Sequence, residues 1–183
     1  RFRVMPRVLD LSMIKEIIDG YASAARRMFQ AGLDGVEFVA SHGYLPAQFF
    51  NPRVNRRADN YGGSLENRLR FATEALAAMR AATSEDFVIG LRISGSERDE
   101  HGLTMDEALE TCLGLEPLLD YVNVTAGTSA SAGGAVHIVP PMAYRNAYLA
   151  SDAARFRQAL DIPIMVAGRI NQPHEAEAVL TQG

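Results

Sequence analysis

Residues 34–52 read DGVEFVASHGYLPAQFFNP, and residues 55–68 read NRRADNYGGSLENR. The first stretch begins as a short apolar strand, Gly35 to Val39, and runs directly into a polar, turn-rich loop. The second stretch contains Ser64, a residue type that commonly caps a helix. Polar residues therefore follow a strand, which is where α/β proteins place their ligand-binding loops.

Strands and helices alternate on both sides of these stretches. Ser12 is expected to cap the first helix and Gly32 to end it, because apolar residues between them follow the 3.6-residue period. Thr104 and Glu107 have the spacing of a capping box. The expected strands are 35–39, 87–93, 121–125 and 162–167. Further helices are expected after Ser64, from Thr104 to Pro117, over 152–160 and over 173–182, and a Gly- and Ser-rich loop over 126–150.

This alternation predicts an α/β fold with a parallel sheet and right-handed crossovers. Four strands suit a small open α/β domain. They equally suit an arc of a (β/α)8 barrel, which normally needs about 250 residues. Periodicity alone leaves both architectures open.

Composition narrows the class of protein. The chain has 183 residues, 48% hydrophobic and 22% charged, which is typical of a globular domain. A net charge of −4 gives no basic surface for nucleic acid or an anionic membrane. Apolar runs are too short to cross a bilayer, and the single Cys112 excludes an intrachain disulfide and a cysteine metal site. We expect a cytoplasmic protein that binds neither nucleic acid, membrane nor metal.

The two stretches together resemble the motif of the Old Yellow Enzyme family of FMN-dependent oxidoreductases, also called the NADH:flavin oxidoreductase family. The runs GLRIS (90–94), DYVNVT (120–125) and VAGRI (166–170) extend the resemblance over nearly the whole chain. It implies that residues 1–183 are a fragment of a single FMN-binding TIM-barrel domain, roughly the fourth to seventh βα units. Such an open arc would expose strand edges, so we expect it to be poorly stable alone.

The resemblance implies that Tyr44 and His42 are catalytic. Tyr44 matches the family tyrosine that protonates the substrate after hydride arrives from the flavin, a role that suits a phenol in a water-poor site. His42 matches the position where a His or Asn hydrogen-bonds the carbonyl of the substrate. The alternative for either residue is a structural role within the loop.

Val39 departs from the pattern of the alkene-reducing members, which usually carry a second histidine there. Valine cannot donate a hydrogen bond, so half of the expected carbonyl clamp is missing. The 2,4-dienoyl-CoA reductases and the trimethylamine-dehydrogenase-like enzymes also lack that histidine. The amine-oxidising branch would be expected to carry a carboxylate at Asn123. Val39, His42 and Asn123 are the predicted substrate-binding residues, and the substrate class stays open.

The same resemblance assigns Arg92, Gly168 and Arg169 to the cofactor. Arg92 would contact the flavin, where a guanidinium stabilises negative charge. Gly168 would allow the backbone to approach the FMN phosphate, with Arg169 and the N-terminal amides of the next helix beside it. NAD(P)H is the expected electron donor, and a 4Fe–4S cluster could follow the barrel. A homo-oligomer is compatible with the family.

Two further predictions concern loops. Arg56, Arg57, Asp59, Glu66 and Arg68 are expected to form an ion-pair network that fixes the loop carrying Tyr44. His137 lies where the dienoyl-CoA reductases have a functional histidine, although the local sequence does not align.

Three functions remain open at this point. The leading hypothesis is an FMN enzyme that passes hydride from NAD(P)H to an alkene conjugated with a carbonyl or thioester. The second is an FMN amine dehydrogenase or N-demethylase acting on a methylated amine. The third is an inactive flavin-binding remnant of the barrel, against which the presence of Tyr44, His42 and Arg92 argues.

Overall fold

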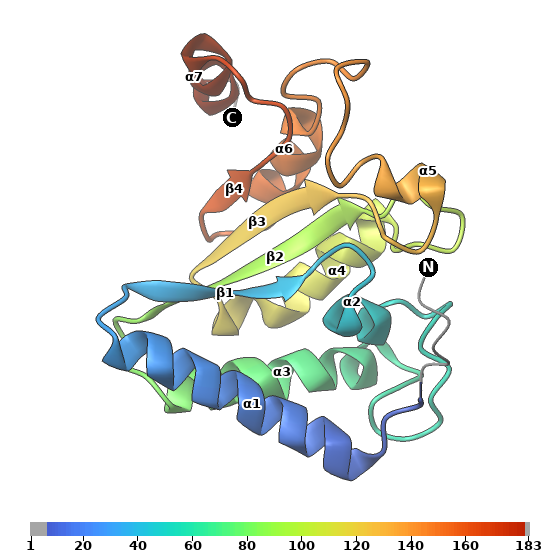
Figure 1. The fold of residues 1–183 in the computed structure, drawn as a ribbon, viewed down its shortest axis with the longest axis vertical. Helices are drawn as coiled ribbons and strands as arrows, with labels where there is room; N and C mark the ends of the chain where they lie inside the picture. Colours follow the sequence, from blue (N-terminus) through green and yellow to red (C-terminus); the bar gives the residue numbers. More distant parts are fainter. Residues whose placement is uncertain (1–6, 182–183) are drawn as a thin grey trace.

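The fold is built on a parallel sheet whose four strands lie in chain order, β1-β2-β3-β4. In the computed structural model, which describes residues 7–181, these are β1 (Gly35–Ala40), β2 (Val88–Ser96), β3 (Tyr121–Ala126) and β4 (Ile164–Val166). Each strand runs parallel to the next, so the carboxyl ends of all four meet at one edge (Figure 1). The predicted parallel α/β arrangement is confirmed.

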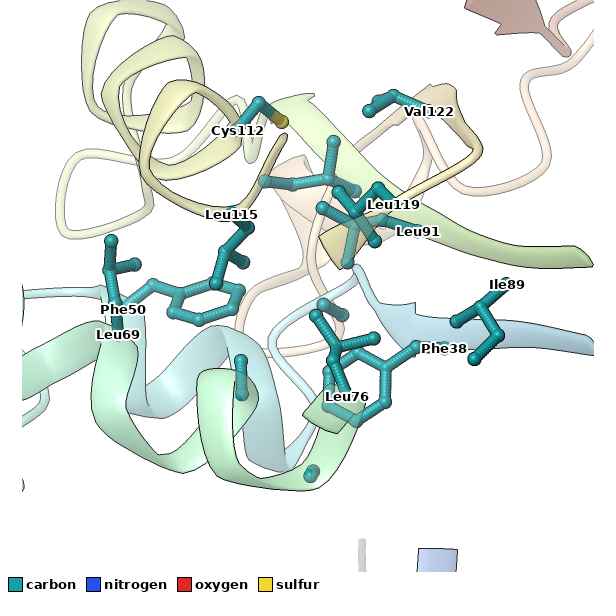
Figure 2. Close-up of a cluster of buried hydrophobic side chains, with 14 of the residues drawn as sticks. Phe38, Phe50, Leu69, Leu76, Ile89, Leu91, Cys112, Leu115, Leu119 and Val122 are labelled. Carbon is teal, nitrogen blue, oxygen red and sulfur yellow. The ribbon is translucent and has the colours of Figure 1, made fainter. Parts of the chain in front are cut away.

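Four helices cover one face of this sheet. They are α1 (Leu11–Gln30), α3 (Leu65–Ala81), α4 (Met105–Leu115) and α6 (Ala150–Ala159). Phe38, Leu91 and Val122 project from successive strands into a cluster with Leu76 of α3 and Leu115 of α4 (Figure 2). Each such side chain contributes about 1.5–3 kcal/mol when fully buried. The layer between sheet and helices is therefore the main source of stability.

Cys112 lies in that layer, as the sequence predicts. Its side chain is fully buried, and burial raises the pKa of its thiol. A buried thiol of this kind is unreactive and acts as a small apolar side chain.

Within residues 7–181, no helix covers the opposite face of the sheet. Side chains alternate along each strand, so Phe38 and Ala40 face the helices while Val39 between them is 42% exposed. We call this second surface the inner face. It carries Glu37 and Val39 of β1, Arg92 of β2, Asn123 of β3 and Met165 of β4.

Some boundaries differ from the sequence predictions. Asp10, not Ser12, caps α1: its carboxylate accepts a hydrogen bond from the Met13 amide at 2.9 Å, and the Ser12 hydroxyl donates to the same carboxylate. The carboxylate is the stronger acceptor for the first free amides of the helix. Gly32 lies just beyond the helix with φ 81°, as predicted. The caps at Ser64 and Thr104–Glu107 are confirmed.

Short elements were the ones that the sequence did not predict. They are α2 (Leu45–Phe50), the 3-10 helix η1 (Glu116–Leu118) and α5 (Ala132–Ala135), the last within the expected Gly- and Ser-rich loop. The last helix, α7 (Pro173–Thr181), begins where expected, and its predicted end at Gln182 lies outside the described residues. Elements of three to six residues show too little periodicity to be distinguished from loops.

The predicted ion-pair network in the loop before α3 is wrong in most of its pairs. Only Arg57 and Asp59 pair with each other, at 2.6 Å. Glu66 instead faces Arg70, and Arg68 donates to backbone carbonyls of the loop. Inward-turned carbonyls need donors, so the long guanidinium side chains satisfy the backbone rather than the neighbouring acids. Arg56 reaches only one carbonyl of the loop, in a weak contact.

A different ion pair holds the loop that follows α2. Two nitrogens of Arg53 reach the two carboxylate oxygens of Glu107, at 2.8 and 2.5 Å, and the guanidinium also donates to the Gly102 carbonyl. These contacts lower the pKa of Glu107 to about 2. The pair therefore ties the loop to the first turn of α4.

Replacing Glu107 by Gln in the complete protein should keep the capping box and remove the ion pair. We expect a loss of about 1–2 kcal/mol at neutral pH. Because the pKa of Glu107 falls from 4.5 to about 2 on folding, the stabilisation is complete above pH 4.5 and is lost as the pH falls toward 2. In thermal unfolding measured across this pH range, the Tm values of wild type and Glu107→Gln should converge as the pH falls. The control Glu110→Gln changes an exposed residue of the same helix, and its Tm should match that of wild type at every pH.

Candidate active site

Backbone strain marks the carboxyl edge of the sheet. Within residues 7–181, four non-glycine residues have positive φ: His42 (61°), Arg98 (54°), Ala147 (50°) and Arg169 (56°). Each lies in the segment that follows a different strand, and each costs about 1–2 kcal/mol. Strain of this kind persists where the surrounding contacts fix the backbone, and it concentrates at functional sites. The carboxyl edge is therefore the candidate active site.

The turn after β1 is fixed by hydrogen bonds to the two neighbouring strand ends. The His42 amide donates to the Ser94 hydroxyl at 3.0 Å, and that hydroxyl donates to the Gly127 carbonyl at 2.8 Å. The Ser129 amide donates to the His42 carbonyl at 3.0 Å. Two segments far from His42 in the sequence thus hold it in its left-handed conformation.

Gly43 has φ 73° and lies against the loop that follows β3. A Cβ atom at Gly43 would approach the Thr128 hydroxyl to 2.3 Å. The carbonyl of Gly43 accepts a hydrogen bond from the Gln48 side chain at 2.8 Å. Glycine is required here both by the backbone conformation and by the space.

The structure brings the two predicted catalytic side chains together. The rings of His42 and Tyr44 lie edge to face, with centroids 6.3 Å apart. Tyr44 is the residue that precedes α2, and it is 52% exposed, whereas His42 is half-buried. The phenol therefore faces open space while the imidazole supports it from one side.

His42 has a defined hydrogen-bonding direction. Burial lowers its pKa, the positive charge of Arg92 lowers it further, and a contact with the Gly127 carbonyl opposes both. The contact joins Nδ1 to that carbonyl at 3.4 Å. A carbonyl only accepts, so neutral His42 carries its proton on Nδ1 and presents Nε2 as an acceptor. To donate to a substrate carbonyl, as the family resemblance implies, His42 would have to be protonated or leave Gly127.

A polar cluster crosses three strands on the inner face. One carboxylate oxygen of Glu37 accepts from Arg92 Nε at 2.5 Å. The other accepts from the Tyr121 hydroxyl at 3.1 Å and from the Asn123 amide at 2.9 Å. Tyr121 reaches across β2 only because residue 90 is glycine: a Cβ there would lie 2.0 Å from the tyrosine ring.

Sequence reasoning missed Glu37. The signal was available, since a carboxylate stands two residues before Val39 in an otherwise apolar strand and so shares its face. Glu37 holds Arg92 through Nε, and the two terminal nitrogens of that guanidinium have no hydrogen-bond partner among the residues described. The carbonyl oxygen of the Asn123 side chain is buried and likewise unpartnered there. The predicted residues Val39, Arg92 and Asn123 lie side by side in the strand register.

Gly168 and Arg169 lie after β4, at the predicted position but with different surroundings. A Cβ at Gly168 would lie 3.0 Å from Leu149, so the absent side chain makes room for protein packing. Arg169 donates to the Asn146 side chain at 3.0 Å, and its Nε is buried with no partner in the described chain. Arg169 thus keeps one spare donor at this end of the sheet.

The two backbone amides that immediately precede α7 are already occupied by a side chain of that helix. The carboxylate of Glu175 accepts from the backbone amides of Asn171 and Gln172, at 2.8 and 3.0 Å. This acid neutralises the positive end of α7. That the N-terminal amides of α7 itself face a phosphate stays a prediction.

His137 lies in an aromatic cluster above the ends of β3 and β4. Its ring centroid is 5.0 Å from that of Tyr144 and 6.1 Å from that of Tyr148. Burial and nearby Arg98 lower the pKa of His137. The structure describes no contact between His137 and the His42–Tyr44 pair.

The NADH:flavin oxidoreductase / NADH oxidase family matches residues 2–183. The chain belongs to this family. Its members are oxidoreductases that use flavin, so the predicted enzyme class, cofactor and NADH-type electron donor are confirmed at the level of the family.

Three relatives illustrate the range of the family. The chain is 35% identical to N,N-dimethylglycine/sarcosine dehydrogenase of Chromohalobacter salexigens, over 97% of this chain and 26% of that protein. It is 36% identical to the multifunctional alkene reductase/demethylase OYE of Caballeronia cordobensis, over 99% of this chain and 27% of that protein. The structure of a 2-naphthoyl-CoA reductase complex superposes with a TM-score of 0.89 at 33% identity, covering 97% of this chain and 27% of that one.

The chain thus spans about a quarter of the length of these relatives. The likeness confirms the predicted fold, an arc of a (β/α)8 barrel. Within the part of the chain that the structure covers, no helix could span a membrane and no three His, Cys, Asp or Glu side chains gather as metal ligands.

Gly43→Ala in the complete protein should displace the turn that carries His42 and Tyr44. The left-handed φ alone costs about 1–2 kcal/mol, and the clash with Thr128 adds to it. Gly63→Ala is the matched control, because Gly63 has φ 85° but nothing within 4 Å of its Cβ position. Thermal unfolding and turnover should therefore separate the two variants. Equal behaviour of both would show that crowding at Gly43 has no role.

Proposed function

We propose that the complete protein is an FMN-dependent oxidoreductase that transfers hydride from NAD(P)H, through the flavin, to an alkene conjugated with a carbonyl or thioester. The observation that carries this proposal is the pairing of exposed Tyr44 with His42 on a strained turn beside Arg92. The phenol of Tyr44, the imidazole of His42 and the guanidinium of Arg92 are thus all available near the carboxyl edge of the sheet. We further propose that residues 1–183 are part of a single FMN-binding barrel domain.

The residues present suit FMN. Arg92 has two free guanidinium nitrogens that match the carbonyl oxygens of a flavin ring, and the Asn123 oxygen is a buried acceptor that matches an N–H. The unpartnered Nε of Arg169 suits a phosphate oxygen. When bound, FMN supplies the two-electron chemistry, and the protein supplies binding and orientation. The family uses NADH-type donors, and we propose that the complete protein does so too. A 4Fe–4S cluster outside this chain and a homo-oligomer stay predictions.

Tyr44 acts as the general acid in this proposal. An alkene that receives hydride at one carbon develops negative charge on the neighbouring carbon and its carbonyl oxygen. The Tyr44 hydroxyl delivers a proton to that neighbouring carbon, and solvent returns a proton to the phenolate, since Tyr44 is 52% exposed. Protonated His42 would stabilise the oxygen by donating a hydrogen bond.

Val39 lies on the substrate side of the proposed site. Val39 is 42% exposed on the inner face, next to Arg92 in the register, and offers an apolar surface. It cannot donate, so His42 is the one polar side chain proposed to contact the substrate carbonyl. Such a site favours substrates that carry their own apolar group beside the alkene.

A second candidate is the oxidation of a methylated amine. Neutral His42 presents an acceptor, which suits an amine N–H better than a carbonyl. A carboxylate also lies beside Asn123, as the amine-oxidising branch would require, but it belongs to Glu37 and is paired with Arg92. That pairing removes most of its attraction for a cationic amine, so alkene reduction remains the first proposal.

Tyr44→Phe in the complete protein should leave reduction of the flavin by NAD(P)H unchanged and slow alkene reduction about 10²–10⁴-fold, since a positioned acid contributes that much. An anaerobic absorption spectrum follows flavin bleaching, and alkene consumption follows the second step. Val54→Ala, exposed in the loop after α2, is the control.

Other results of the absorption measurement would favour one of the two alternative functions. Bleaching by a methylated amine, and not by NAD(P)H, would support the amine dehydrogenase. A protein that binds no flavin, even when FMN is supplied, would be the inactive remnant and would refute the proposal.

Glu37→Gln should raise the reduction potential of the bound flavin. Without the carboxylate, the charge of Arg92 is uncompensated and favours the reduced, anionic flavin. A rise on the order of 30 mV corresponds to about 1.4 kcal/mol for two electrons. Redox titration measures it, with Glu66→Gln, whose side chain is 86% exposed, as the control. An unchanged potential would show that Arg92 does not face the flavin.

A further inference from the structure

Glu97 is a buried acid that the proposed chemistry does not use. It follows β2 and is 4% exposed, which makes it the one buried charged side chain in residues 7–181. Burying a carboxylate is costly unless it is paired. The nearby Arg53 is engaged by Glu107, so Glu97 has no ion-pair partner within the described chain.

The two carboxylate oxygens of Glu97 have different surroundings. Oε2 accepts a hydrogen bond from the Leu103 amide at 2.8 Å, and the Glu97 amide donates to the Leu103 carbonyl at 2.9 Å. These two bonds fix the side chain on one side. Oε1 is buried and makes no well-formed hydrogen bond to any described residue.

The unpartnered oxygen points to the turn that carries His42 and Tyr44. It lies 3.7 Å from the Cβ position of Gly43, whose other side meets the Thr128 hydroxyl. Besides the Leu103 amide, the backbone amide of Gly43 and the Asn51 side chain are donors that stabilise the ionised carboxylate. Gly43, Asn51 and Glu97 line a cavity of about 160 Å³, which Gln48 and Asp99 also border. A buried carboxylate oxygen without a hydrogen-bond partner is rare in folded proteins and therefore requires an explanation.

We propose that Glu97 is a positioning residue: its fixed, ionised carboxylate holds the left-handed turn at Gly43, and thereby His42 and Tyr44, and protonation releases that turn. The inference rests on the proposed function for its kinetic consequence, but the contact itself is independent of the substrate. An anion attracts the Gly43 amide toward the cavity. A neutral carboxyl loses this attraction and brings its own O–H, which needs an acceptor in the same small space.

The surroundings of Glu97 raise the pKa of its carboxyl group. Burial and the nearby Asp99 raise its pKa, while the amides of Leu103 and Gly43 oppose the shift. The other charged or titratable groups facing it are Arg53, from the loop after α2, and His101, whose side chain is exposed on the same loop as Glu97. Because the pKa is raised, Glu97 becomes neutral at a higher pH than an ordinary glutamate. The turn should be held above that pKa and loosened below it.

The test compares Glu97→Gln with wild type in the complete flavin-loaded protein. We expect kcat for the substrate to fall about 10- to 100-fold, because a small displacement of a catalytic group lowers the rate by about this factor. KM should change little, and the rate of flavin reduction by NAD(P)H should not change. The acid limb of kcat against pH should disappear in the variant. Glu97→Asp, which keeps the charge but shortens the reach, should retain an acid limb at reduced kcat.

Two controls separate Glu97 from its neighbours. Glu100→Gln changes an exposed acid on the same loop and should behave as wild type. His101→Gln removes the other titratable side chain of the cavity and should keep the acid limb. An acid limb that vanishes in His101→Gln and persists in Glu97→Gln would overturn the proposal.

Hydrogen exchange tests the contact without reference to activity. Exchange in the peptide covering residues 41–51 should be faster in Glu97→Gln than in wild type and Glu100→Gln, and wild type should approach the variant at acid pH. If wild type turns over neither an alkene nor an amine, the proposed function fails while this measurement still decides the role of Glu97. Equal exchange and equal kcat in Glu97→Gln and wild type would refute it.

Discussion

The parallel register of β1, β2 and β3 determines which side chains share the inner face of the sheet. Val39, Arg92 and Asn123 occupy one row across the strands, with Glu37 and Tyr121 in the row beneath. A slip of one residue in β2 would turn Arg92 into the apolar layer beneath the helices and bring Leu91 to the site. The buried residues Leu91, Ile93 and Val122 prevent that slip. The core thus fixes the chemistry of the opposite face.

Rigid packing at the sheet supports strain at its edge. The residues that follow the four strands include left-handed His42, Arg98, Ala147 and Arg169. Hydrogen bonds between loops, such as His42 to Ser94 and Ala147 to Arg169, hold two of these conformations in place. Strained positions are retained when neighbouring contacts over-determine them. Here the neighbours come from adjacent strands, so the edge is rigid although it consists of loops.

Two of the three predicted helix caps are confirmed, whereas the predicted contacts between side chains of a folded loop mostly are not. The caps at Ser64 and Thr104–Glu107 depend on residues three apart, and both are confirmed. Asp10 displaced Ser12 because a carboxylate two residues earlier reaches the same amides. The predicted ion-pair network of the loop before α3 failed because the fold turns backbone carbonyls toward Arg68, which no sequence pattern reports.

The sequence by itself determined the alternation of strands and helices, the family, and the positions of His42 and Tyr44 in the turn after a strand, since periodicity and long motifs are local properties of the chain. Only the tertiary structure revealed that Glu37 holds Arg92, that Gly90 lets Tyr121 cross β2, and that Glu97 lies behind Gly43. These contacts join residues about 30 to 55 positions apart. They exist only once the register and the burial of the sheet bring those side chains together, which no local pattern can specify.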